Sequence, residues 1–192
     1  MPKQTVAEEL ELLRDAVEDL TGLPSRWSGH VVLLDSAQME ALNGRPILAQ
    51  KRWICDIVVN TGIVEQPSRW RTYLHEILHS VSVGTNEADL RRFRGWEEGV
   101  VEWWQRRLRP QVLSRIQISV PETTFSPLEV SWPYNPYLEA LHVLQQASGV
   151  EDQLFYVDLL RIPLAERLAY TRSLNKSADY YRLFASVIGR LR

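Results

Sequence analysis

Apolar residues near the start of the chain follow two different spacings. Residues 5–20 carry valines and leucines three or four positions apart with acidic residues between them, which predicts an amphipathic helix. Residues 30–35 form a short apolar run typical of a strand, and a short helix is expected over residues 36–42. In residues 47–60, alternate side chains fall on opposite faces of an extended chain, which predicts a second strand-like stretch.

Longer helices are expected in the rest of the chain. Residues 69–83 contain no proline or glycine and carry an apolar stripe at helical spacing. A polar, arginine-rich connection over residues 84–95 precedes a helix over residues 96–109, which Pro110 is expected to close. The same reasoning predicts four more helices, over residues 137–147, 151–161, 164–174 and 177–190.

The stretch between these two groups of helices, residues 111–135, has a mixed pattern. Residues 116–120 alternate like a short strand. Four prolines between positions 121 and 136 predict an irregular loop after it. No internal repeat or low-complexity tract interrupts the chain.

Together these segments predict an α+β fold. A small N-terminal sheet is expected to pack on the helix of residues 69–83, and a mainly helical C-terminal lobe follows. With 192 residues the chain is long enough for one domain with a substantial core. We divide this single domain, residues 1–192, into an N-terminal lobe of about 1–84 and a C-terminal helical lobe of about 85–192.

Charge and composition narrow the function classes. The formal net charge is −2, so no bulk field attracts the chain to nucleic acid or to a membrane surface. Arginine clusters at residues 91–94 and 106–109 are expected to be solvated helix faces or ends. The single Cys55 excludes an internal disulfide and a thiolate metal site. No stretch has the length of a membrane span or a signal core, so we expect a cytoplasmic protein.

The clearest chemical pattern is His75-Glu76-Ile77-Leu78-His79. Two histidines four residues apart share one face of a helix, one turn apart, so both imidazoles can bind the same metal ion. Glu76 lies about 100° around the helix from His75, where a general base for an attacking water belongs. Neutral imidazoles suit Zn²⁺, whose catalytic sites use three protein ligands and leave a fourth position open.

A third ligand is expected further along the chain. Glu98 follows His79 after eighteen intervening residues, in a Glu-Gly-Val-Val-Glu segment that ends at Glu102. This pattern resembles the gluzincin zinc peptidases, especially the aminopeptidase branch with its W-x-x-E-G signature. The resemblance implies a zincin-like fold in which His75, His79 and Glu98 bind zinc and Glu76 is the general base. It also implies that Glu102 hydrogen-bonds a ligand histidine, which would fix the orientation of that imidazole.

A second, looser match lies at residues 137–144. Their sequence, Tyr-Leu-Glu-Ala-Leu-His-Val-Leu, is similar to the Y-x-K-G-x-x-L-L segment of gluzincin aminopeptidases, with Glu and Ala in place of Lys and Gly. The resemblance implies that the hydroxyl of Tyr137 stabilises the oxyanion of the tetrahedral intermediate, a task suited to a phenol donor. Tyr134 and His142 are alternatives for this role.

Other zinc-protease assignments fit less well. Glu97 is the nearest alternative to Glu98, which we prefer because a glycine follows it and another acid lies four residues further on. The metzincin extension would need glycine at position 82 and histidine at position 85, where the chain has Ser82 and Thr85.

These observations predict a zinc-dependent peptide-bond hydrolase that acts on a peptide or protein substrate. We expect an endopeptidase, because the G-x-M-E-N exopeptidase motif of the aminopeptidase branch is absent. An extended peptide is expected to pair with an exposed edge of the strand within residues 47–60. One alternative is an intracellular regulatory protease that cleaves a single partner protein. Another is a non-catalytic, zinc-stabilised binding module, against which Glu76 argues because a structural zinc site needs no base.

Overall fold

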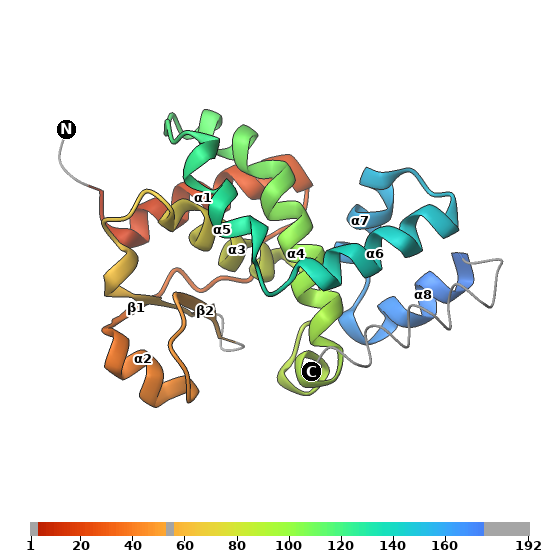
Figure 1. The fold of residues 1–192 in the computed structure, drawn as a ribbon, viewed down its shortest axis with the longest axis horizontal. Coiled ribbons are helices and arrows are strands. Elements are labelled where there is room, and N and C mark those ends of the chain that lie inside the picture. The colour runs from red at the N-terminus through yellow and green to blue at the C-terminus, as the bar shows by residue number, and fades with distance from the viewer. Residues whose placement is uncertain (1–3, 53–55, 175–192) are drawn as a thin grey trace. The chain divides into compact units, whose positions relative to one another are not determined.

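The computed structural model describes residues 4–52 and 56–174 (Figure 1). The α+β prediction is confirmed: a small sheet is accompanied by many helices. The elements, in chain order, are α1 (Val6–Thr21), β1 (Val31–Leu34), α2 (Ser36–Asn43), β2 (Ala49–Lys51), β3 (Ile57–Asn60), η1 (Thr61–Ile63), α3 (Arg69–Val81), α4 (Glu87–Arg115), η2 (Glu122–Thr124), α5 (Ser126–Val130), α6 (Asn135–Ser148), α7 (Asp152–Arg161), η3 (Leu164–Glu166) and α8 (Arg167–Leu174). The helix predicted over residues 177–190 lies outside the described residues.

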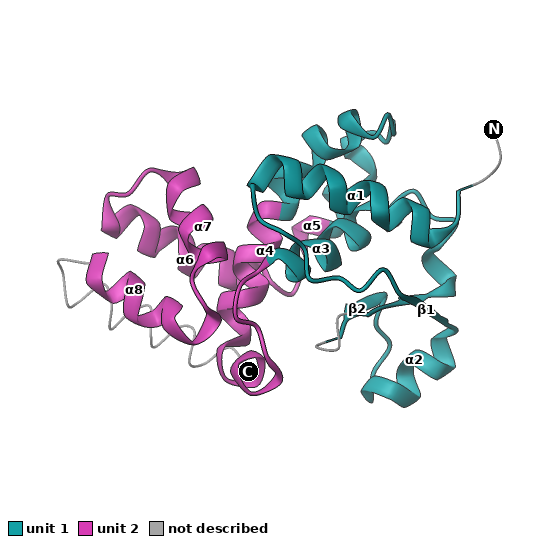
Figure 2. Cartoon of the chain, turned by 180° about the vertical axis from the view of Figure 1, so that it is seen from behind, with its two compact units in different colours: residues 1–81, 105–128 teal, residues 82–104, 129–192 magenta. Residues whose placement is uncertain are grey.

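Two compact units divide the chain (Figure 2). Unit 1 comprises residues 1–81 and 105–128, and unit 2 comprises residues 82–104 and 129–192. Helix α4 contributes to both, because its residues up to Trp104 belong to unit 2 and those from Gln105 onward belong to unit 1. Within the described ranges, no helix is both long enough and apolar enough to cross a membrane.

Unit 1 contains a three-stranded sheet in the order β1-β3-β2. Strands β1 and β3 run parallel, with Val31 opposite Ile57, whereas β2 is antiparallel to β3, with Lys51 opposite Ile57. All four residues of β3 are buried, as expected for a central strand. The extended stretch predicted over residues 47–60 is therefore a pair of strands, and β2 forms an edge of the sheet.

Helix α3 packs against α1 and β2 within unit 1. The apolar stripe predicted for this helix is its buried face, where Leu74 and Ile77 have no exposed surface. A bidentate ion pair attaches the start of α3 to α1: Nε and Nη2 of Arg69 donate to the Glu9 carboxylate at 2.9 and 2.7 Å. Such fork-shaped pairs fix direction as well as distance, so the helix that carries both histidines is held at its amino end.

Helix α4 begins earlier than predicted. Its first residue is Glu87, so most of the expected polar connection is in fact helical. Asn86 caps this start, because its Oδ1 accepts a hydrogen bond from the backbone N–H of Asp89 at 3.0 Å. The backbone of Phe93 is not helical (φ −121°, ψ 26°), so a kink separates the first turns from the segment that the sequence predicted.

Helix α4 also ends later than predicted. It continues through Pro110 to Arg115, so the expected stop at the proline is wrong. Buried residues such as Leu113 lie beyond the proline, and their packing outweighs the lost backbone hydrogen bond. The strand predicted over residues 116–120 does not form, because the chain leaves the helix through Gln117, which has a positive φ of 59°.

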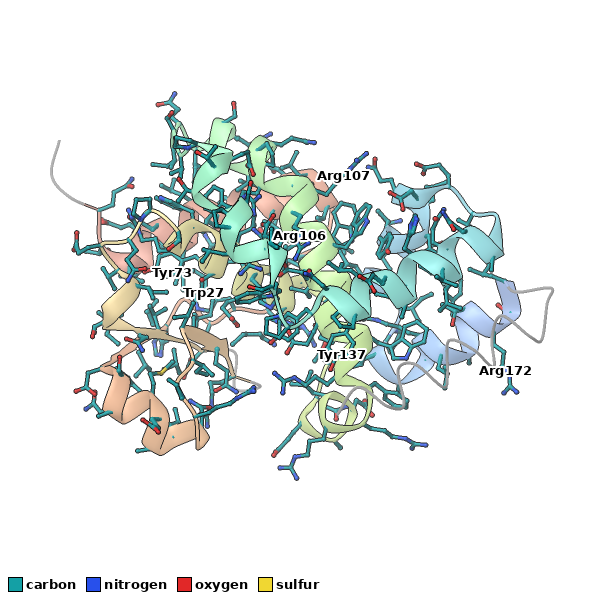
Figure 3. All side chains as sticks on the ribbon, in the orientation of Figure 1. Trp27, Tyr73, Arg106, Arg107, Tyr137 and Arg172 are labelled. Atoms are coloured by element: carbon teal, nitrogen blue, oxygen red, sulfur yellow. The ribbon has the colours of Figure 1, made fainter. Side chains whose placement is uncertain are left out.

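In unit 2, helix α6 lies close to two glycines of α4. A Cβ atom at Gly95 would lie 2.8 Å from Cε1 of Tyr137, whose side chain is labelled in Figure 3. A Cβ atom at Gly99 would lie 2.6 Å from Cδ1 of Leu141. Both distances are well below van der Waals contact, so the close approach of α6 requires these two glycines.

A fully buried ion pair also stabilises unit 2. Nη1 of Arg167, the first residue of α8, donates to Oε2 of Glu97 on α4 at 2.8 Å, and both side chains have no exposed surface. Ser82 completes the cluster, because its hydroxyl donates to the same carboxylate oxygen at 2.8 Å and accepts from Nη2 of Arg167 at 2.5 Å. Burial lowers the pKa of Arg167, and the carboxylate of Glu97 opposes that shift.

Removal of one partner of this buried pair is expected to destabilise the protein strongly. Arg167→Met removes the fully buried cation that faces the Glu97 carboxylate, which should lower the free energy of unfolding by about 3–5 kcal/mol in urea titrations. Arg161→Met, at an exposed position of the neighbouring helix, is the matched control and should change it by no more than about 0.5 kcal/mol. Equal effects of the two substitutions would contradict the assigned importance of the pair.

Candidate metal centre

The two histidines of α3 meet at their ring nitrogens. Nε2 of His75 and Nε2 of His79 lie 3.2 Å apart, and the two rings are nearly perpendicular, at 80°. The helical period produces this pairing, since residues four apart lie one turn above one another. His75 is buried, with 7% of its surface exposed, and His79 is half-buried.

The separation of the two nitrogens fits a shared zinc ion. Zn–N bonds of about 2.0–2.1 Å at a tetrahedral angle place two ligand nitrogens about 3.3 Å apart. At this distance one neutral ring can also donate an N–H···N hydrogen bond to the other, which holds the two nitrogens together when no metal is bound. The pair is arranged as two ligands of one cation would be.

Glu76 lies beside this pair and is held by the edge strand. Its Oε2 accepts a hydrogen bond from the backbone N–H of Lys51 on β2 at 2.6 Å, and only 7% of Glu76 is exposed. The next backbone N–H, that of Arg52, points to the other side and bonds the carbonyl of Asp56. Strand β2 thus uses one side for the sheet and the other to orient the Glu76 carboxylate.

The two adjacent acids of α4 have different surroundings. Glu97 has no exposed surface, and its carboxylate accepts hydrogen bonds from Arg167 and Ser82. Glu98 is 7% exposed, and one of its oxygens, Oε1, accepts from Nε of Arg94 at 3.1 Å. Consecutive helical residues point about 100° apart. Because Glu97 faces Arg167, Glu98 points to another side of the helix.

One ligand atom from each of His75, His79 and Glu98 lies within 4.8 Å of the other two. Among the described residues these three therefore form a possible metal-binding group, the same three that the sequence predicts. The set of two imidazoles and one carboxylate matches the ligands of catalytic zinc sites. Glu102, predicted to support a ligand histidine, is fully buried one helical turn after Glu98, and its role stays a prediction.

Arg94 connects Glu98 to an aromatic residue of unit 2. Its Nε donates to Glu98, and its Nη2 donates to the hydroxyl oxygen of Tyr134 at 3.3 Å. Burial lowers the pKa of Arg94, but the charge of Glu98 and the contact with Tyr134 outweigh this effect and raise it above its ordinary value. Arg94 therefore stays protonated and holds the Glu98 carboxylate from the side.

The three candidates for an oxyanion donor occupy different environments. Tyr137 packs its ring against Gly95 and is 9% exposed. Tyr134 stacks on Tyr137, with ring centroids 6.0 Å apart, and contacts Arg94 through its hydroxyl. His142 is exposed, with its Nε2 2.9 Å from the amide nitrogen of Gln146. Tyr137 stays the predicted donor, and Tyr134 is the alternative that hydrogen bonds link to Glu98.

Two contacts of this site were not expected from the sequence. Every residue except proline has a backbone N–H, so the residue type at position 51 does not indicate that its N–H binds Glu76. Arg94 did carry a signal, because it precedes Glu98 by four residues, the spacing of ion pairs along a helix. That signal was lost because the helix was expected to start only at residue 96.

Loss of the Arg94 contact is expected to weaken metal binding. Arg94→Gln should lower zinc affinity about 10–100-fold, the usual effect of removing a group that orients a ligand. The side chain is 43% exposed, so water screens its repulsion of the metal and the loss of orientation should dominate. Arg91→Gln, an exposed arginine of α4 paired with Glu87, is the control. Unchanged or tighter zinc binding by Arg94→Gln in a competition titration would refute this role.

No protein-family model, no curated protein and no solved structure matches the chain. The resemblance to gluzincin peptidases therefore rests on the residues of this chain alone. The zincin-like fold and the bound zinc stay predictions.

Proposed function

We propose that this protein is a zinc-dependent peptidase in which His75, His79 and Glu98 bind the metal. The observation that carries the proposal is the convergence of the two imidazole nitrogens, 3.2 Å apart, with a carboxylate of the same ligand group. Three protein ligands leave the fourth position of a tetrahedral zinc for water or substrate, which is the arrangement of catalytic rather than structural sites.

A zinc ion at this site would supply an activated water and a Lewis acid for the scissile carbonyl. Glu76 would take a proton from the attacking water and deliver it to the leaving amine. Its position next to His75 and its low exposure support this role, because a general base must be close to the reacting water and shielded from bulk solvent.

The backbone N–H of Lys51 supports the same assignment of roles. A carboxylate on a flexible side chain has several rotamers, and a 2.6 Å hydrogen bond from a strand restricts Glu76 to one of them. Only one oxygen is bound in this contact, so the other remains available to accept a proton. The edge strand would thereby align the base.

We propose that the substrates are peptides or proteins and that the enzyme cleaves them at internal peptide bonds. Strand β2 is an edge of the sheet and packs against α3, which carries the histidines. Edge strands can pair with an extended peptide through main-chain hydrogen bonds. The N–H of Lys51 is already bound to Glu76, so a substrate would pair with the other outward groups of β2, next to the site and without any recognition of its termini.

The role of Glu76 is tested by a change that removes basicity and keeps shape. Glu76→Gln should retain bound zinc, because no ligand is lost, while the rate of cleavage of a peptide library falls by about 10²–10⁴. Zinc content is measured on the purified variant by elemental analysis, and cleavage by mass spectrometry with and without a chelator. The amide can still accept a hydrogen bond from Lys51, so the local structure should persist.

A control variant tests whether the loss of any nearby acid, rather than of Glu76 in particular, lowers the cleavage rate. Glu65→Gln changes an acid that precedes α3 and lies outside the ligand group, so it should cleave the library at the normal rate. If Glu76→Gln cleaves as fast as the unchanged protein, the assignment of the base is wrong. If the unchanged protein binds zinc but cleaves no peptide in the library, the peptidase proposal itself fails.

A further inference from the structure

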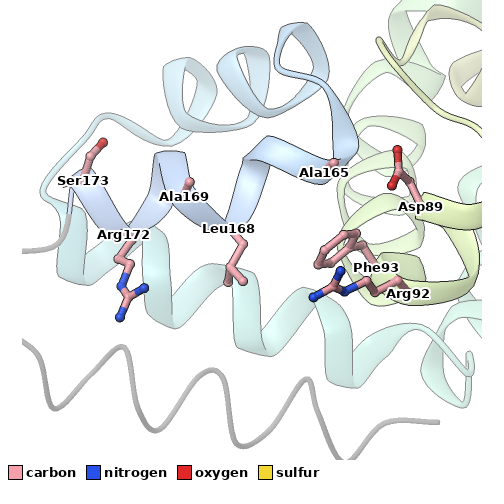
Figure 4. A pocket seen from close by; sticks show the side chains of 8 residues that line it. All are labelled: Asp89, Arg92, Phe93, Ala165, Leu168, Ala169, Arg172 and Ser173. Atoms are coloured by element: carbon pink, nitrogen blue, oxygen red, sulfur yellow. The ribbon is translucent and has the colours of Figure 1, made fainter.

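A pocket in unit 2 lies between the first turns of α4 and the α8 region. Its cavity measures about 590 Å³, within the range of sites that hold small molecules. Eight of the described residues line it: Asp89, Arg92, Phe93, Ala165, Leu168, Ala169, Arg172 and Ser173 (Figure 4). None of them belongs to the candidate metal centre, so the pocket is a separate feature.

Small and apolar side chains create the space in this pocket. Ala165 and Ala169 lie one helical turn apart and contribute almost no volume. Phe93 and Leu168 supply apolar surface, and Figure 4 shows Leu168 between the Arg92 end and the Arg172 end. The backbone of Phe93 departs from helical geometry, so the kink of α4 occurs at a residue that lines the cavity. An apolar chain of several carbons would fit such a lining.

The charged residues of the pocket favour an anion. Among the described lining residues, Arg92 and Arg172 carry guanidinium groups and Asp89 carries a carboxylate. The side-chain amide of Asn86 donates a hydrogen bond to Oδ2 of Asp89 at 2.5 Å. Arg92 lies over the ring of Phe93 at 5.1 Å and forms no ion pair with any residue that the structure describes. The planar fork of donors on Arg92 suits a carboxylate.

We propose that this pocket binds a monocarboxylate with an apolar chain, with the carboxylate at Arg92 and the chain on Phe93 and Leu168. A medium-chain fatty acid and the free carboxyl-terminal residue of a peptide share this chemistry. Inorganic phosphate does not share it, because phosphate has no apolar chain to lie on Phe93 and Leu168. The proposal is independent of the zinc site.

The probe is octanoate, with its neutral amide, octanamide, as the matched control. Two-dimensional amide NMR of the full chain should show octanoate shifting resonances at residues 89–93 and 165–173, with an affinity at least about 10-fold above that of octanamide. N-acetyl-leucine is titrated alongside. Tighter binding of octanoate identifies a fatty acid as the natural class, and tighter binding of N-acetyl-leucine identifies a peptide terminus.

Variants locate the site. Arg92→Gln should weaken octanoate binding about 10-fold or more, because a charge-assisted hydrogen bond is lost, whereas Arg91→Gln on the same turn should not. Ala169→Trp fills the cavity from an exposed position that tolerates a larger side chain, and should abolish binding. His79→Ala should bind octanoate as the unchanged protein does, which excludes capture of the carboxylate by a metal at the histidines.

The proposal is overturned if octanamide binds as tightly as octanoate, or if the shifts fall outside the two segments. It is also overturned if Arg92→Gln and Ala169→Trp both leave the affinity unchanged, or if inorganic phosphate binds more tightly than octanoate. Loss of octanoate binding in His79→Ala would assign the carboxylate to the metal centre instead.

Discussion

The buried ion pair between Glu97 and Arg167 sets the orientation of the part of α4 that matters for function. Two opposite charges without exposed surface must face each other, because an unpaired charge at that depth would cost several kcal/mol. Once Glu97 faces Arg167, the helical period directs the neighbouring Glu98 elsewhere and leaves its carboxylate for other partners. Gly95 and Gly99, four residues apart, form a further face, and α6 packs there through Tyr137 and Leu141. Three sides of α4 therefore have different roles: one binds Arg167, one presents the Glu98 carboxylate, and one packs against α6.

Helix α3 follows the same logic with different chemistry. Its buried stripe packs in unit 1, its first residue is fixed by Glu9, and its spacing of four residues brings His75 and His79 together. The base is then aligned by the main chain of the edge strand rather than by another side chain. Backbone donors cannot be lost by most substitutions, so this contact would tolerate change at position 51 better than a side-chain contact would.

The parts of the fold that were predicted from the sequence are those encoded by local periodicity. The stripe of α3, the histidine pair and the α+β class all follow from residues close together in the chain. The errors occurred where distant packing overrides a local signal, as at Pro110, which α4 passes through, and at residues 116–120, which form no strand. The partner of Glu97 lies 70 residues away at Arg167, and no pattern within a single helix indicates such a pair. In the sequence, the glycine after Glu98 and the acid four residues further on favour Glu98 over Glu97 as the ligand. The ion pair between Glu97 and Arg167 is a separate observation that the sequence does not indicate.

The central claim is that Glu98, and not its neighbour, completes a metal site with the two histidines. It is tested most directly by elemental analysis of three proteins equilibrated with buffered zinc: the unchanged chain, Glu98→Gln and Glu97→Gln. Each substitution removes one negative charge and nearly no volume, but Glu97→Gln also breaks the buried pair with Arg167, so zinc content is compared on protein whose fold is verified by circular dichroism. We predict about one zinc per chain for the unchanged protein and for Glu97→Gln, and a large loss of zinc for Glu98→Gln alone. Full zinc content in Glu98→Gln, or loss of zinc in a folded Glu97→Gln only, would contradict this account.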